Sequence, residues 1–217
     1  MNKKDYVFGV LAGLLIGLLA LPVLKVAKPE IYANIGSIVF PFFLIATPLG
    51  LMVANYIGRK IPVIWQIGKF GVIGVLNTLL DWGVLAFLTF SLRSNFSIDS
   101  KDVLLIGISF YSVYKAVSFI IANINSYFWN KYWTFESAAA TKTKTEFLQF
   151  FVVSILGFAV NVGIASYIFR AIKPLGGLNF DQWGIIGAAV ATLASLVWNF
   201  VGYKFIVFAP KNQESAS

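Results

Sequence analysis

The stretch FGVIGVLNTLLDWGVLAFL, residues 70–88, decides the fold. It is strongly apolar, and Asp81 is its only charged residue. A helix needs about 20 mostly apolar residues to cross the hydrocarbon core of a membrane. Because lipid cannot satisfy free backbone polar groups, an apolar run of this length is expected to be helical. The stretch therefore predicts a transmembrane helix over Phe70–Leu92.

Five further stretches have the same character, and none shows the two-residue alternation of a membrane β-strand. Together they predict an all-α integral membrane protein with six transmembrane helices. The predicted helices are Val7–Leu24, Ile35–Ile57, Phe70–Leu92, Val103–Trp129, Phe147–Phe169 and Trp183–Val207.

The composition supports a membrane protein and excludes most catalytic chemistry. The chain is 12% charged, whereas soluble domains carry about 25% charged residues. It has no cysteine and no histidine, which excludes thiolate nucleophiles, imidazole bases and most transition-metal sites. We therefore expect no catalytic residue, no metal and no cofactor. In a membrane chain, the net charge of +8 indicates flanks that face anionic lipid rather than a nucleic-acid partner.

Lysine and arginine residues are unequally divided between the two ends of the predicted helices. Ten lie on the side of the chain termini, six lie on the opposite side, and Lys115 lies inside a helix. Positive residues concentrate on the cytoplasmic side of membrane proteins. The sequence therefore predicts a multi-pass protein of the inner (plasma) membrane with both termini in the cytoplasm.

The first two predicted helices form a hairpin of their own. The basic start and apolar run resemble a signal peptide, but the run is long and no A-x-A site follows, so we expect a retained helix. Gly9, Gly13 and Gly17 share one helix face and predict close packing within the hairpin or against a second copy of the chain. Pro41 and Pro48 predict kinks in the second helix.

The four later helices contain an internal repeat. Residues 70–88 align with FFVVSILGFAVNVGIASYI, residues 150–168, at an offset of 80. SYFWNKYWTF, residues 126–135, aligns with NFVGYKFIVF, residues 199–208, at an offset of 73. The two matches keep the same order, which predicts a duplicated two-helix unit whose copies run parallel. The aligned polar residues are Asp81 with Asn161 and Lys131 with Lys204.

These patterns divide the chain into three predicted parts. Residues 1–66 form the N-terminal hairpin and an interfacial linker that begins at Gly58. Residues 67–209 form a four-helix core made of two parallel two-helix repeats, and residues 210–217 form a cytoplasmic tail.

Two ionisable residues lie deep in the predicted core. Asp81 is about 16 Å and Lys115 about 21 Å from the cytoplasmic face, counting 1.5 Å per residue along each helix. Both depths fall within the middle third of a hydrocarbon core about 30 Å thick. Charges at this depth mark either a structural ion pair between two helices or a transport site. Both interpretations stay open, because a paired lysine can exchange its partner for an incoming anion.

Amides, a tyrosine and lysines complete the candidate site. Asn123 and Asn125 point to different faces of their helix and are not expected to share one role. Interior amides most often bridge helices and interfacial lysines most often anchor them, but three lysines together would form a basic rim able to hold a phosphate headgroup. The candidate binding residues are Lys115, Asp81, Asn77, Asn125, Tyr127, Asn130, Asn161 and Asn199, with Lys69, Lys131 and Lys204 as the rim.

Three motifs occur in order along the core: KFGVIGVLNTLLDW at residues 69–82, NSYFWNKYWTF at residues 125–135 and VGYKFIVF at residues 201–208. They resemble the GtrA-like family of small four-span membrane proteins. The resemblance covers roughly residues 67–208, so the N-terminal hairpin lies outside it. The family varies at the position of Asp81, so this carboxylate is not expected to be essential. The motif positions that carry over are Asn77, Asp81, Asn130, Lys131 and Lys204.

The resemblance implies flipping of a polyprenyl-phosphate-linked monosaccharide from the cytoplasmic to the outer leaflet. A membrane glycosyltransferase would then transfer the sugar to a bacterial cell-wall or surface polysaccharide. Since the sequence has no P-loop or other nucleotide motif, we expect downhill transport without a motor. In this interpretation the rim collects the phosphate and Lys115 is its counter-ion midway. Asn77, Asn125 and Tyr127 would receive sugar hydroxyls.

Two other functions remain open. A scaffold would anchor a glycosyltransferase without moving lipid, and the glycine face of the first hairpin suits such a contact. A small secondary transporter of organic cations would use Asp81 as its embedded carboxylate, although Lys115 argues against a cationic cargo. A homodimer is a further expectation, because four core helices make a thin enclosure.

Overall fold

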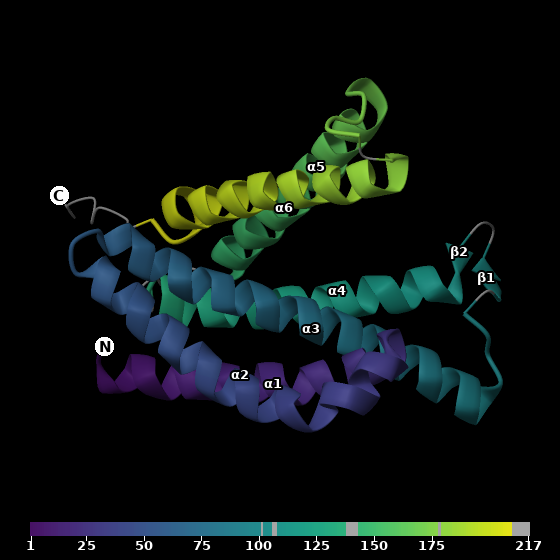
Figure 1. The fold of residues 1–217 in the computed structure, drawn as a ribbon, viewed down its shortest axis with the longest axis horizontal. Coiled ribbons are helices and arrows are strands. Elements are labelled where there is room, and N and C mark those ends of the chain that lie inside the picture. Colours follow the sequence, from purple (N-terminus) through teal and green to yellow (C-terminus); the bar gives the residue numbers. More distant parts are fainter. Residues whose placement is uncertain (101, 106–107, 138–142, 178, 210–217) are drawn as a thin grey trace. The chain divides into compact units, whose positions relative to one another are not determined.

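The computed structural model describes residues 1–100, 102–105, 108–137, 143–177 and 179–209. These residues form six α-helices and a small two-stranded sheet (Figure 1), so the predicted all-α architecture is confirmed. The predicted tail, residues 210–217, and three of the lysines counted for the topology lie outside the described residues; those lysines are Lys101, Lys142 and Lys211. The helices are α1 (Lys3–Ala27), α2 (Pro29–Gly58), α3 (Pro62–Phe96), α4 (Phe110–Trp129), α5 (Thr143–Ala171) and α6 (Phe180–Gly202).

Within the described residues, five helices are long and apolar enough to cross a membrane: α1, α2, α3, α5 and α6. The remaining helix, α4, has 20 residues and is therefore about 30 Å long, which matches the thickness of the hydrocarbon core. Its lower hydropathy comes from Lys115, two asparagines and several tyrosines. The same polar residues that lower the hydropathy of α4 include the candidate site residues Lys115, Asn125 and Tyr127.

The fourth helix begins later than the sequence predicted. Val103–Leu105 (β1) and Ile108–Ser109 (β2) pair as antiparallel strands, and α4 begins only at Phe110. The hydroxyl of Ser109 accepts from the backbone N–H of Ser112 at 3.3 Å, as an N-cap side chain does. The prediction of a span from Val103 is wrong because this cap sets the start of the helix.

The third helix begins earlier than predicted. Pro62 fits the first turn, where its missing N–H would have no partner, and the helix continues without a break to Phe96. Most of the predicted interfacial linker is therefore the first part of α3. Ser97 ends the helix with a φ of 56°, and its N–H donates to the carbonyl of Arg93 at 3.1 Å.

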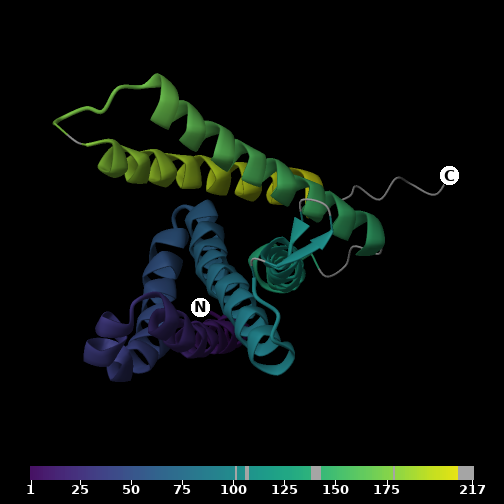
Figure 2. The same cartoon turned by 90° about the vertical axis from the view of Figure 1, so that its right-hand side faces the viewer.

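The chain divides into two compact units, residues 1–136 and residues 137–217. In the first unit α1 packs against α2 and α3, and α4 packs against α3 (Figure 2, where α4 is seen almost end-on beside α3). In the second unit α5 packs against α6. The predicted boundary after residue 66 stays a prediction.

The glycine face of α1 packs within the hairpin. A Cβ atom at Gly13 would lie 2.6 Å from the carbonyl oxygen of Phe43, and one at Gly17 would lie 3.0 Å from that of Phe40. The backbones of α1 and α2 can approach this closely only because these positions lack side chains. This face is therefore occupied by α2. Figure 1 also shows α2 bent along its length, consistent with its two internal prolines.

The hairpin also contributes to the core of the first unit. Ala12 of α1, Leu51 of α2 and Ile73 of α3 are almost fully buried around Trp133. The ring of Phe8 stacks on that of Trp133, with centroids 5.7 Å apart. The aromatic motif that ends the first repeat is thus buried in part by residues of the preceding hairpin.

Both repeats end in a π-helical turn, which the sequence analysis did not predict. η1 (Asn130–Thr134) follows α4, and η2 (Tyr203–Val207) follows α6. The N–H of Phe135 donates to the carbonyl of Asn130 at 2.9 Å, and the N–H of Phe208 donates to that of Tyr203 at 2.8 Å. The two turns start 73 residues apart, which is the offset of the sequence alignment (203 − 130). The duplicated turn supports the predicted repeat.

Candidate functional site

A strip of polar side chains joins α3 to α4. Asn77 and Asp81 are four residues apart and lie on one face of α3. Ser118 and Asn125 are seven residues apart and share a face of α4, with Lys115 one turn before Ser118. We call these five residues the α3–α4 strip.

The central contact of the strip is an ion pair. The ammonium of Lys115 donates to Oδ2 of Asp81, and the hydroxyl of Ser118 donates to Oδ1 at 2.6 Å. Ser118 is fully buried, whereas the side chain of Lys115 is 42% exposed and that of Asp81 is 17% exposed. The two charges at similar depth therefore pair, with the carboxylate more enclosed than the ammonium.

The amides lie closer to the end of the helices that carries Lys69: Asn77 is one turn from Asp81 on α3, and Asn125 is about two turns from Ser118 on α4. The Asn125 amide donates to Oδ1 of Asn77 at 2.6 Å and accepts from Nε1 of Trp129 at 3.1 Å. Asn123 instead donates to the carbonyl of Phe119 in its own helix at 2.9 Å. The expectation that the two asparagines of α4 differ in role agrees with these contacts. Of these two asparagines, Asn125 is the one whose side chain bonds to α3.

Three other predicted binding residues are buried outside the strip. Lys131 is 3% exposed, and its ammonium donates to the hydroxyl of the buried Tyr127 at 3.2 Å. The Asn130 amide donates to the carbonyl of Ser126 at 2.9 Å. Tyr127, Asn130 and Lys131 therefore pack the end of α4 and the start of η1.

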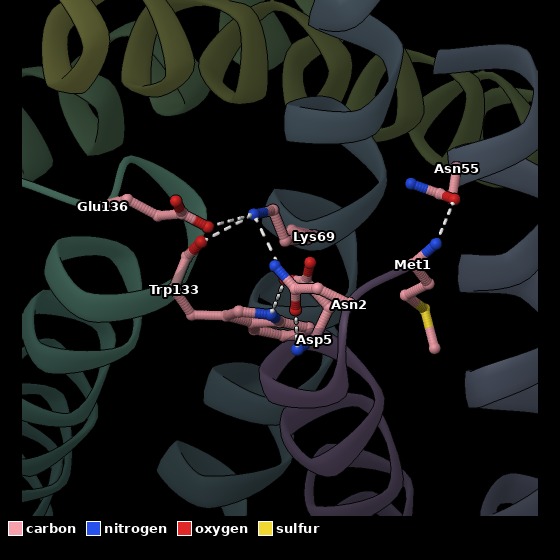
Figure 3. A network of polar contacts seen from close by, with 7 residues as sticks. All are labelled: Met1, Asn2, Asp5, Asn55, Lys69, Trp133 and Glu136. Carbon is pink, nitrogen blue, oxygen red and sulfur yellow. Dashed lines mark hydrogen bonds and ion pairs between the residues drawn. The ribbon is translucent and has the colours of Figure 1, made fainter. Parts of the chain in front are cut away.

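Lys69 lies in a buried network at the same end of the first unit (Figure 3). Its ammonium donates to the carbonyl of Trp133 at 2.7 Å and to Oε1 of Glu136 at 3.3 Å. The same ammonium is 3.6 Å from Oδ1 of Asp5, on α1. The charge of Lys69 is thus already balanced by two carboxylates.

The predicted basic rim does not form an open surface in the first unit, because both of its lysines there are buried. The third, Lys204, belongs to the second unit, where its ammonium lies 5.7 Å from the ring centroid of Phe200 and 5.6 Å from that of Phe205. Sequence reasoning placed these lysines by their positions at helix ends. It missed Asp5, although an acid four residues after the start and directly before an apolar run was a readable signal.

The second unit carries an uncharged counterpart of the strip. Asn161 of α5 donates to the hydroxyls of Thr192 at 3.4 Å and Ser195 at 3.3 Å, both on α6. Asn199 packs against Gly157, where a Cβ atom would lie 2.1 Å from its Oδ1. Asn161 aligns with Asp81, and both bind a hydroxyl of the following helix. The first repeat therefore carries the charged pair, and the second carries amides.

The strip has the chemistry of a site for an anionic, hydroxyl-bearing group. A half-exposed ammonium within apolar helices attracts an anion, because no other cation of the strip competes and the surroundings are poorly solvated. The amides of Asn77 and Asn125 can exchange hydrogen bonds with hydroxyl groups.

Comparison with known proteins adds a family. The family model described as "GtrA/DPMS, transmembrane domain" matches residues 69–208. The chain is 26% identical over 156 residues to "Uncharacterized membrane protein YngA" of Bacillus subtilis (strain 168), an alignment that covers 70% of this chain and 88% of that protein. No solved structure gives a significant match. The family match begins at Lys69 and leaves α1 and α2 outside it.

Proposed function

The chain belongs to the GtrA/DPMS transmembrane-domain family, and from this premise we propose that it flips a polyprenyl-phosphate-linked monosaccharide from the cytoplasmic to the outer leaflet. The sugar then serves a membrane glycosyltransferase that decorates a cell-surface polysaccharide. The transport is downhill and is driven by consumption of the sugar lipid in the outer leaflet.

The cargo explains what the protein must supply. The prenyl tail can stay in lipid, but an unpaired phosphate and a sugar cannot cross hydrocarbon without a large desolvation cost. A flippase therefore needs a counter-ion and hydroxyl partners at mid-membrane depth, open to the lipid side.

The observation that carries the proposal is the half-exposed Lys115, in the second turn of α4, which is paired with Asp81, about midway along α3. In the resting protein Asp81 balances the ammonium, which offsets the cost of a lone charge in the membrane, and Ser118 donates to the same carboxylate. During passage the phosphate takes the place of Asp81 as the partner of Lys115. Asp81 keeps the hydrogen bond from Ser118 meanwhile.

The amides of the strip provide the sugar contacts. Asn77 and Asn125 bond to each other, and Trp129 donates to Asn125. A sugar hydroxyl can replace one amide as partner of the other, and the indole face can stack on the apolar face of the ring. Lys131 and Tyr127 are not part of this proposed path, because they are buried in a contact with each other.

Flipping by purified protein in vesicles tests the proposal. The measurement is the fraction of polyprenyl-phosphate-linked sugar that becomes accessible to an added impermeant glycosidase. We expect Lys115→Ala to lower the rate by about tenfold or more, because it removes the counter-ion of a poorly solvated anion. Lys115→Arg should retain more activity than Lys115→Ala, since it retains the charge. Lys173→Ala, a lysine exposed outside the helices, is the matched control.

A Lys115→Ala rate equal to that of the wild type would refute the counter-ion role. If the folded wild type does not flip the lipid at all, flipping itself is wrong. A requirement for the protein in cells would then favour the scaffold function. The cation transporter is not proposed, since Lys115 and Ser118 already occupy both oxygens of Asp81.

A further inference from the structure

Two hydrogen-bond donors, from Trp133 and Lys69, lie beside the carboxylate of Asp5 (Figure 3). Its Oδ1 accepts from Nε1 of Trp133 at 3.0 Å and lies 3.6 Å from Nζ of Lys69. All three side chains are at least 95% buried. Two donors from different elements, α3 and η1, thus converge on one anionic oxygen.

The ammonium of Lys69 has a donor to spare for this anion. A lysine carries three N–H donors. One goes to the carbonyl of Trp133 and one to Glu136. The third can be directed at Asp5. The donors would hold an anion at this position whatever chain or molecule supplied it.

The donors and the anion come from different parts of the chain. Lys69 and Trp133 lie inside the family segment, residues 69–208, whereas Asp5 belongs to the hairpin outside it. The segment that the family model matches therefore does not provide the carboxylate. Lys69 and Trp133 of this segment provide the donors, and Asp5 of the hairpin provides the anion.

We propose that Lys69 Nζ and Trp133 Nε1 form a phosphate site of the core, and that Asp5 occupies it as an internal competitor. Carboxylate and phosphate oxygens accept the same charge-assisted hydrogen bonds. The site takes the phosphate group of the lipid when the carboxylate leaves. This rests on the proposed function for the identity of the lipid, but not for the existence of the site.

The position of Asp5 makes its release local. Asp5 is in the first turn of α1, where its backbone N–H donates to the capping side chain of Asn2 at 2.7 Å. First turns of helices open at lower free energy than helix interiors. On the other side of the ammonium, the Glu136 side chain is 50% exposed. Opening of one turn would therefore free the site, while Phe8 keeps Trp133 in place.

Binding of polyprenyl monophosphate to the full chain in detergent, followed by native mass spectrometry, tests this. Asp5→Asn removes the charge but leaves an amide oxygen that can still accept from Trp133. We expect it to bind the lipid at least about tenfold more tightly, because a site that is open in at most about 10% of molecules loses that factor of affinity. Asp99→Asn, which breaks an exposed ion pair with Arg93, is the matched control and should not change binding.

Two further variants and two further probes identify the cause of the gain. Adding Lys69→Gln to Asp5→Asn should abolish it. Neutral polyprenol should show no gain, because it carries no anion. Inorganic phosphate distinguishes the sources: a gain with it too means that the site takes any phosphate group, and a gain with the lipid alone means that the tail is required. Both results support the site.

A folded Asp5→Asn variant that binds polyprenyl monophosphate no better than the wild type overturns the proposal, as does an equal gain for polyprenol. If Asp5→Asn does not fold, Trp133→Phe replaces it. That change retains the stacked ring and removes the donor, and it should weaken binding severalfold in the wild-type background. Unchanged binding then overturns the site.

The outcomes separate this proposal from the flippase function, because binding is measured without transport. Tighter binding by Asp5→Asn together with a wild-type flipping rate for Lys115→Ala would retain the phosphate site and remove the counter-ion. The opposite pair of results would retain the flippase mechanism and reduce Asp5 to a structural ion pair.

Discussion

Asn123 and Asn125 are identical residues two positions apart on α4, yet their side chains make different contacts. Each residue of a helix is rotated by about 100° from the one before it, so residues two positions apart point to nearly opposite faces. Asn125 therefore reaches Asn77 on α3, while Asn123 bonds within α4. The sequence predicted this difference but not which of the two would form the link.

This difference can be measured as stability. Hydrogen bonds between membrane helices contribute about 0.6 kcal/mol on average and up to about 1.7 kcal/mol. We expect Asn125→Ala, which removes bonds to Asn77 and Trp129, to lower the free energy of unfolding in detergent by about 1 kcal/mol. Asn123→Ala should cost less, because its bond joins no second helix. Equal losses from both variants would mean that the Asn77 contact adds nothing.

Two lysines show where residue-level prediction stops. Lys115 and Asp81 have similar predicted depths on consecutive helices, so the sequence allows them to pair, and in the structure they do. Lys69 was assigned to an open rim from its position at a helix end. Its actual partner, Asp5, comes from the first helix of the chain. Helix periodicity and depth indicate which residues of consecutive helices can meet. They do not indicate which distant helix supplies a countercharge.

At the scale of elements, the close approach of α1 and α2 depends on glycine. At Gly13 a Cβ atom would lie only 2.6 Å from a backbone carbonyl of α2, and a backbone atom cannot yield as a flexible side chain can. Gly50, on α2 of the same hairpin, has no atom within 4 Å of such a position.

The pair forms a matched experiment on the hairpin. We expect Gly13→Ala to destabilise the protein by about 1–3 kcal/mol, the usual range for overpacking a tight contact. Gly50→Ala should be neutral or slightly stabilising, because alanine is the better helix former. Thermal unfolding of both variants in the same detergent provides the comparison. A Gly13→Ala midpoint at or above that of Gly50→Ala would contradict the packing described.

The sequence patterns did not predict the π-helical turns η1 and η2. Each inserts one extra residue into a helical turn, which changes the ladder from i−4 to i−5 without requiring a special residue type. Asn130 begins one turn and Tyr203 the other, so the two share no initiating residue. Only the backbone hydrogen bonds of Phe135 and Phe208 reveal them.

At the scale of the whole molecule, the predicted topology assigns opposite sides of the membrane to the connections on either end of the helices. Lys60, between α2 and α3, falls on the cytoplasmic side, and Lys173, after α5, falls on the outer side. Both side chains are exposed. The chain has no cysteine, so a single introduced thiol would report its own position alone.

Labelling with a membrane-impermeant maleimide tests that topology. In intact cells Lys173→Cys should react, whereas Lys60→Cys should react only after the membrane is opened. This follows from the excess of lysine and arginine on the side of the termini. The reverse pattern would mean that the protein has the opposite orientation in the membrane, and the proposed direction of transport would then be wrong too.

The amino-acid sequence was sufficient to predict the all-α membrane architecture, the six helices and the internal repeat, and it allowed an ion pair between Asp81 and Lys115 without requiring one. These follow from apolar run length, periodicity and depth, which are local or involve neighbouring helices. Only the tertiary structure decided that the hairpin outside the family segment buries Trp133 and places Asp5 on Lys69. The physical reason is that apolar packing between distant helices is not directional. Many arrangements satisfy the same hydropathy pattern, and side-chain shape and paired charge select one of them.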